Sequence, residues 1–256
     1  MNLNPETLSA VKNLIYSTAD DHLVLGHRNS EWTGLGPILE EDIAFSSMAQ
    51  DKLGQALALY QLLNKLGERD PDTIAFTRKE NEFRCCHLTE YPIGDYGFSL
   101  MRHFLFDEAA LLRFDMLSNS GFTELSHIAK KFRGEIKYHV MHAEEWIKQL
   151  GNGNEESNRR IQIMFDTVYP LAHGIFEPLE NENILIENKI YEGENELEQR
   201  WRVRIGKIVK DANIILNETE PKDKHYGGRR GMHTEYLKPL LLEMTEVFSI
   251  DPNAEW

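Results

Sequence analysis

The chain has 256 residues, of which 41% are hydrophobic and 27% are charged, and its formal net charge is −14. This composition is typical of a soluble globular protein that is long enough to bury a large core. The acidic charge argues against nucleic acid or an anionic membrane as a partner, and no stretch approaches the roughly 20 apolar residues of a membrane-spanning helix.

Helical periodicity dominates the chain, and we find no alternating pattern typical of strands. The periodicity predicts helices over residues 5–32, 37–66, 73–86, 98–120, 122–150, 156–176, 197–216 and 237–248. The segments GLGP, YPIGDYG and GNGN read as breaks between helices. We expect an exposed polar loop over 180–196 and a second polar loop around GGRRG, 227–231.

Four of the predicted helices are longer than the usual average and form two helical hairpins. The short helix and the YPIGDYG loop between the hairpins are long enough for a crossover connection. This order predicts an all-α, ferritin-like four-helix bundle with additional C-terminal helices. We expect a single domain over residues 1–256, with the bundle core at about 5–175 and the extra helices at about 195–250.

The second hairpin carries side chains that are suited to binding metal. In carboxylate-bridged dinuclear bundles, two helices each supply a carboxylate and two each supply Glu-x-x-His. Glu135, His139 and His142 line one face of the helix 122–150, and Asp107 or Glu108 joins them from the preceding helix. These residues resemble half of a dinuclear site, and the alternative interpretation is a polar seam or a surface cluster.

The first hairpin does not supply the other half. Lys52 and Gln55 lie three residues apart, the spacing at which a helix presents two metal ligands to a bundle core. An ammonium group repels cations and has no lone pair until it loses a proton. A register shifted to Asp51 and Gln55 still lacks a histidine, so this helix argues against a working metal centre.

Seven segments spread over almost the whole chain carry a family resemblance. They are DDHLVLGHRNSEW, LEEDIAF, QDKLGQA, RDPDTIAFTRKENEFR, EYPIGDYGFSLMRHFLFD, EIKYHVMHAEEWIKQLGNGNEES and GGRRGMHTEYLKPLLLEM. With these segments in this order, the chain resembles the C subunits of bacterial ring 1,2-phenylacetyl-CoA epoxidases, which are multicomponent monooxygenases. In that family the related A subunit holds the di-iron site, and the C subunit shares its ferritin-like fold.

The resemblance implies a structural role in aerobic phenylacetate degradation. The partners it implies are the catalytic di-iron A subunit, which this chain would bind and stabilise, and the other subunits of the complex. The assembled complex would use dioxygen and NADPH, through a reductase with flavin and iron–sulfur groups, to epoxidise the aromatic ring of the CoA thioester. The resemblance implies no cofactor and no catalytic residue in this chain.

Comparison with the catalytic relatives suggests a metal site that has lost its ligands in the first hairpin. Where those relatives have the Glu and His of E-A-G-H, this chain has Lys52 and Gln55. Where their first helix presents a glutamate, this chain has His22.

The second hairpin keeps only part of the family's ligand set. His139 and Asp107 match the pattern, but Ile136 stands where the second Glu-x-x-His would have its carboxylate. Glu135 is one residue away, which places it about 100° around the helix. Too few ligands remain for two irons.

The alternative, from a different functional class, is a metalloenzyme with an unusual site at Asp107, Glu135, His139 and His142. Lys52 favours the structural role. Its ammonium cannot bind a metal ion, and if it is buried it must instead be paired with a carboxylate. We expect that ammonium to lie within salt-bridge distance of Asp107 or Glu135.

Other residues have simpler interpretations. Arg229 and Arg230, in the GGRRG segment that precedes His233, are candidates for contact with a phosphate or a partner carboxylate, or belong to a solvated loop. The adjacent Cys85 and Cys86 cannot form a normal structural disulfide, so we expect packing or surface thiols in a reducing cytoplasm. Trp32 and Trp146 are expected to be packing residues.

Overall fold

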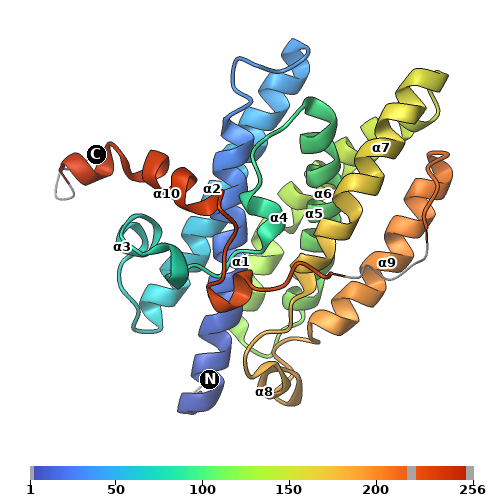
Figure 1. The fold of residues 1–256 in the computed structure, drawn as a ribbon. Coiled ribbons are helices and arrows are strands. Elements are labelled where there is room, and N and C mark those ends of the chain that lie inside the picture. Colours follow the sequence, from blue (N-terminus) through green and yellow to red (C-terminus); the bar gives the residue numbers. More distant parts are fainter. Residues whose placement is uncertain (1–2, 218–222, 252–256) are drawn as a thin grey trace. The chain divides into compact units, whose positions relative to one another are not determined.

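The computed structural model describes residues 3–217 and 223–251, and these contain helices, turns and loops but no strand (Figure 1). The α-helices are α1 (Pro5–Ser30), α2 (Leu39–Lys65), α3 (Pro71–Phe76), α4 (His87–Glu90), α5 (Tyr96–Ser118), α6 (Thr123–Gly151), α7 (Glu155–Ala172), α8 (Glu182–Glu187), α9 (Glu194–Asp211) and α10 (Leu237–Thr245). Short 3-10 turns cover Glu80–Glu82, His173–Phe176, Gly228–Arg230 and Phe248–Ile250. The predicted all-α, ferritin-like class with additional C-terminal helices is confirmed, with two pairs of long helices, α1/α2 and α5/α6, in the expected order. No helix in the described ranges is both long and apolar enough to span a membrane.

The chain clusters into two compact units. The first comprises Met1–Asn13 and Ile93–Tyr226, and the second comprises Leu14–Pro92 and Gly227–Trp256. The prediction of a single domain over the whole chain stays a prediction.

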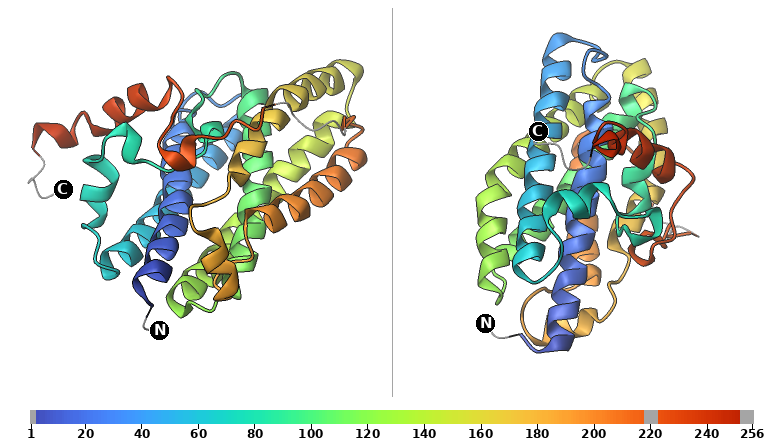
Figure 2. Two further views of the ribbon diagram at one scale, coloured as in Figure 1. Left: turned by 60° about the horizontal axis from the view of Figure 1, so that its bottom comes forward. Right: turned by 90° about the vertical axis from the view of Figure 1, so that its left-hand side faces the viewer.

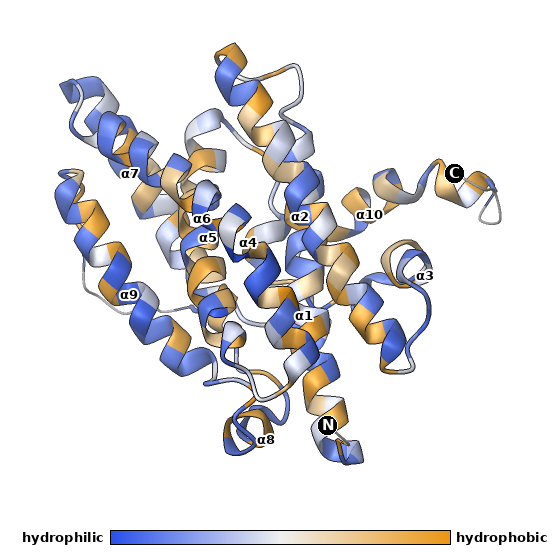
Figure 3. Ribbon diagram, turned by 180° about the vertical axis from the view of Figure 1, so that it is seen from behind, coloured by the Kyte–Doolittle hydropathy of each residue, from blue (hydrophilic) through white to orange (hydrophobic). Residues whose placement is uncertain are grey.

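In the first unit, α5 packs against α6, α7 and α9, as two views of the ribbon show (Figures 1 and 2). The helix α9 is largely hydrophilic, with hydrophobic residues recurring along it (Figure 3). Its buried Leu197, Trp201 and Ile205 recur every four residues, which is the spacing of one helical face. Trp201 stacks on Tyr169 with ring centroids 5.3 Å apart, and its indole N–H donates to the carbonyl of Leu105 at 2.9 Å. The buried indole is therefore satisfied as well as packed.

In the second unit, α2 and α10 both contact α3. The phenol of Tyr60 on α2 donates to the Asp20 carboxylate on α1 at 2.6 Å. A Cβ on Gly26 would lie 3.2 Å from Leu53, so a larger residue there would crowd the close approach of α1 and α2. Buried Phe45, Leu59 and Leu63 supply apolar contacts along α2.

The helix predicted over 73–86 is wrong beyond Phe76. The helix α3 ends at Phe76, and Phe83 and Cys86 have extended backbone angles, with ψ of 155° and 151°. The backbone N–H groups of Arg84 and Cys86 donate to the carboxylates of Asp20 and Asp21, at 2.7 and 2.8 Å, instead of to helical carbonyls. Acceptors from α1 therefore replace the helical hydrogen bonds that periodicity predicts.

The exposed loop predicted over 180–196 is also wrong. It contains the short helix α8, and Leu185 and Ile190 are buried. The carboxylate of Glu194 is fully buried and accepts two hydrogen bonds from Arg113 of α5, at 2.5 and 2.9 Å. A charge that looks solvated in the sequence is one half of a buried pair, and only the fold reveals its partner.

Candidate functional site

The positions that the sequence singles out on α2 are buried. The side chains of Lys52 and Gln55 have no exposed surface, and His22 of α1 is 1% exposed. Since a lysine is rarely buried unless it is paired, the face of α2 that carries Lys52 is not an ordinary solvated surface.

In the first unit, Asp107 of α5 lies among histidines. Its Oδ2 is 2.5 Å from Nδ1 of His103 on the same helix, and its Oδ1 is 3.8 Å from Nδ1 of His139 on α6. The ring centroids of His103 and His142 are 5.5 Å apart. The structure thus brings together Asp107, His139 and His142, which sequence reasoning selected, with His103, which it missed. The signal for His103 is its spacing of four residues before Asp107, which places both on one face of α5.

Within the first unit, this cluster lacks the carboxylate that a Glu-x-x-His motif on α6 would supply. A dinuclear bundle site uses a carboxylate from each of its four helices. On α6 the position of the expected carboxylate holds Ile136, which is fully buried, and Glu135, one residue away, is only half-buried.

Glu108, the neighbour of Asp107, takes part in a different interaction. It pairs with Arg204 of α9, which also contacts Glu144 of α6 at 3.0 Å. Burial raises the pKa of Glu108 to about 8, although the hydrogen bond from Arg204 opposes that rise. Glu108 therefore helps to join α5, α6 and α9 through a shared arginine.

The carboxylates of Asp20 and Asp21, the two residues before His22 in the sequence, form ion pairs with arginines. Asp20 accepts from the guanidinium of Arg78, at 2.6 and 3.0 Å. Asp21 forms a second two-pronged pair with Arg229, at 2.8 and 2.7 Å. Both carboxylates are buried, so each arginine supplies the positive charge that its partner needs.

The interpretation of GGRRG as a solvated loop is wrong for Arg229, because this residue is only 6% exposed. Its guanidinium also donates to the carbonyls of Ser17 and Arg84, at 3.1 and 2.8 Å. Arg229 is therefore engaged inside the second unit, and contact with a partner or a phosphate stays a prediction for the exposed Arg230.

Trp32 is buried and lies 6.1 Å from the ring of Phe45, which confirms its packing role. The ring of Trp146 meets that of Tyr96 edge-on at 6.5 Å. Both cysteines are buried free thiols, so the interpretation as surface thiols is wrong. The sequence offers no local signal for these burials beyond the apolar character of the side chains.

Comparison with known proteins gives two matches. A family model described as "Phenylacetic acid catabolic protein" matches residues 2–256. The chain is also 32% identical over 240 residues to a protein of Escherichia coli (strain K12) that is named as the C subunit of 1,2-phenylacetyl-CoA epoxidase. That alignment covers 93% of this chain and 95% of the relative, so the similarity extends over both proteins.

Proposed function

Because the chain belongs to the family of phenylacetic acid catabolic proteins, we propose that it is the structural subunit of a multicomponent phenylacetyl-CoA 1,2-epoxidase. It binds and stabilises the catalytic di-iron subunit in aerobic phenylacetate degradation, in the cytoplasm, and contributes no catalytic residue. The di-iron centre belongs to that partner, and NADPH, flavin and iron–sulfur groups belong to the reductase. The end-to-end similarity to the C subunit of an epoxidase supports the assignment.

The observation that carries the structural role is the complete burial of Lys52 and Gln55 on one face of α2. An inward-facing ammonium and amide at the spacing of a ligand pair cannot hold iron as a carboxylate and an imidazole do. A buried ammonium also repels a nearby cation strongly, because the low dielectric of the interior screens it poorly.

The buried ion pairs give this role a physical basis. Asp20 and Asp21 are paired with Arg78 and Arg229, and these pairs link α1 to the segments that follow α3 and precede α10. Asp20 and Asp21 therefore need no metal ion to neutralise them.

Reconstitution of the complex with and without this chain tests the proposal. We expect no oxidation of phenylacetyl-CoA by the chain alone, and a lower soluble yield or a lower turnover of the catalytic subunit when the chain is omitted. Full yield and full activity of the catalytic subunit without this chain would contradict the structural role.

Iron content tests the alternative. A metalloenzyme at Asp107, Glu135, His139 and His142 predicts iron or manganese bound in a fixed ratio to the chain and lost in an Asp107→Asn variant. The structural role predicts no stoichiometric iron, manganese or zinc at these positions after growth in iron-rich medium. Two irons per purified chain would favour the metalloenzyme.

A further inference from the structure

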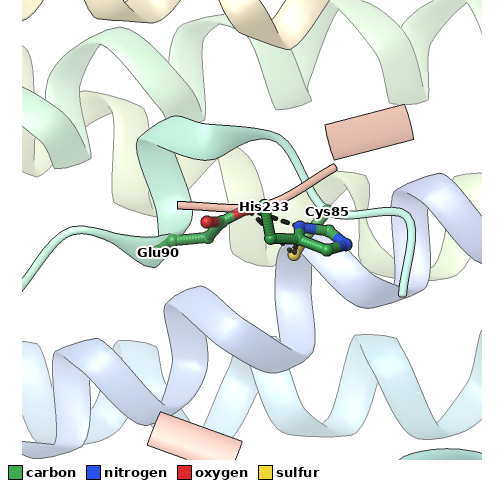
Figure 4. A group of neighbouring side chains, drawn as sticks. All are labelled: Cys85, Glu90 and His233. Atoms are coloured by element: carbon green, nitrogen blue, oxygen red, sulfur yellow. Dashed lines mark hydrogen bonds and ion pairs between the residues drawn. The ribbon is translucent and has the colours of Figure 1, made fainter. Parts of the chain in front are cut away.

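Three side chains converge in the second unit at a place that the proposed function does not use (Figure 4). Cys85 precedes α4, Glu90 is the last residue of α4, and His233 lies between the Gly228–Arg230 turn and α10. Cys85 and Glu90 are fully buried, and the side chain of His233 has no exposed surface. Such a group of thiol, carboxylate and imidazole is the ligand chemistry of zinc sites.

The spacing of the three atoms matches the size of a metal ion. Nδ1 of His233 lies 2.8 Å from Oε1 of Glu90, and Sγ of Cys85 lies 3.8 Å from that oxygen and 4.0 Å from that nitrogen. The centre of a triangle with these sides is about 2.1 Å from each corner, and zinc binds nitrogen, oxygen and sulfur at about 2.0–2.3 Å.

The outer atoms of the same side chains have partners of their own. Oε2 of Glu90 accepts from the backbone N–H and the hydroxyl of Thr234, at 2.7 and 2.6 Å. Nε2 of His233 lies 3.1 Å from the carbonyl of Phe83, so this nitrogen carries a proton and donates it. The tautomer that leaves a lone pair on Nδ1 is therefore available, and metal-binding histidines are commonly held in this way by a carbonyl.

The ligands of the cluster suit the charge of a divalent cation. A Zn²⁺ ion bound to one thiolate, one carboxylate and one neutral imidazole leaves no net charge in the buried cluster, so binding avoids the cost of burying an unpaired charge. Binding would release the proton of the Cys85 thiol to solvent.

We propose that Cys85, Glu90 and His233 form a binding site for one Zn²⁺ ion, which fastens the segment before α10 to α4. A thiolate with an imidazole selects a borderline-soft ion such as zinc over magnesium or calcium, and water commonly completes a site with three protein ligands. The site is separate from the family's di-iron positions, so the loss of ligands at Lys52 and Gln55 does not bear on it.

Cobalt titration of the purified full-length chain tests the site, after removal of metal with a chelator. A Co²⁺–thiolate bond produces an intense near-ultraviolet charge-transfer band, and we expect this band to saturate at one ion per chain and to disappear when Zn²⁺ is added. Because the chain has only two cysteines, a Cys86→Ser variant leaves Cys85 as its single thiol, and we expect this variant to keep the band.

The matched Cys85→Ser variant should lose the band and lose at least tenfold in affinity for Zn²⁺. Absence of the band in both the parent and Cys86→Ser, or its retention in Cys85→Ser, would overturn the proposal. If Cys85→Ser fails to fold, the titration of Cys86→Ser decides the question, because it isolates Cys85 in an otherwise native cluster. These outcomes are independent of epoxidase activity and of iron content.

Discussion

Arg229 and Asp21 form a buried two-pronged ion pair although 208 positions separate them in the sequence. Their side chains are 1% and 4% exposed. The pair fastens the GGRRG segment to α1 inside the second unit, close in sequence to His233 of the proposed zinc site. The GGRRG segment is therefore part of the folded core of this unit.

Replacing Arg229 should destabilise the protein strongly. We expect Arg229→Met to lower the free energy of unfolding by about 3–5 kcal/mol, because it leaves the Asp21 carboxylate buried without a cation. Urea denaturation measures the change. Lys207→Met, which removes an exposed positive charge, is the control and should stay within about 0.5 kcal/mol of the parent. Equal losses in the two variants would contradict the special role of the pair.

Acid should weaken the first unit through Glu198. Burial raises the pKa of this carboxyl group, but hydrogen bonds from His173 and Arg202 outweigh burial, and with the nearby Lys224 they lower the pKa to about 2. A lowered pKa means that the folded state favours the ionised form, so this stabilisation is present above about pH 4.5 and is lost as the pH falls towards 2.

We therefore expect Glu198→Gln to be less stable than the parent by about 2–3 kcal/mol at pH 7, with the difference shrinking between pH 4.5 and 2. Denaturation curves measured across this range give the difference at each pH. The exposed Glu187→Gln is the matched control. A difference that does not change with pH would show that the variant acts through packing alone.

Gly228 should tolerate no side chain. An added Cβ would lie 2.1 Å from the carbonyl oxygen of Cys85, a backbone atom that cannot easily move. We expect Gly228→Ala to lower the free energy of unfolding by about 1–3 kcal/mol. At Gly54, in the middle of α2, an added Cβ would meet no atom within 4 Å apart from its chain neighbours and the nearby backbone of its own helix, so Gly54→Ala should raise stability by about 0.4–1 kcal/mol. Thermal melts of the two variants should therefore shift in opposite directions, and a shift in the same direction would contradict this argument.

The buried Lys52 should be essential for the fold. Lys52 is fully buried, and we expect Lys52→Met to lower the free energy of unfolding by about 3–5 kcal/mol, because the carboxylate predicted to pair with the ammonium would lose its cation. That carboxylate is predicted to be Asp107 or Glu135, so a second substitution, Asp107→Asn, should recover part of the loss if Asp107 is the partner. Lys65→Met, at the exposed end of α2, is the control. A Lys52→Met variant that melts like the parent would contradict the prediction.

The long helices could be predicted from the sequence because their signals are local. Periodic apolar residues determine which segments become α1, α2, α5 and α6, and the order of these helices predicts the ferritin-like class. The resemblance to the catalytic relatives implies that Lys52, Gln55 and Ile136 stand at ligand positions, and hence a ligand set too small for two irons. The spacing of His103 and Asp107 is equally local, but it lies outside that ligand pattern.

The tertiary structure decided the pairings between distant segments. Nothing near Arg229 in the sequence identifies Asp21 as its partner, and nothing near Glu90 identifies His233. The helix predicted over 73–86 ends early because carboxylates on α1 accept its backbone hydrogen bonds, and the loop over 180–196 is buried in part because Arg113 needs the charge of Glu194. Local periodicity determines where a helix can form. Each buried charge and each buried backbone N–H also needs a partner, and the tertiary structure decides which group supplies it.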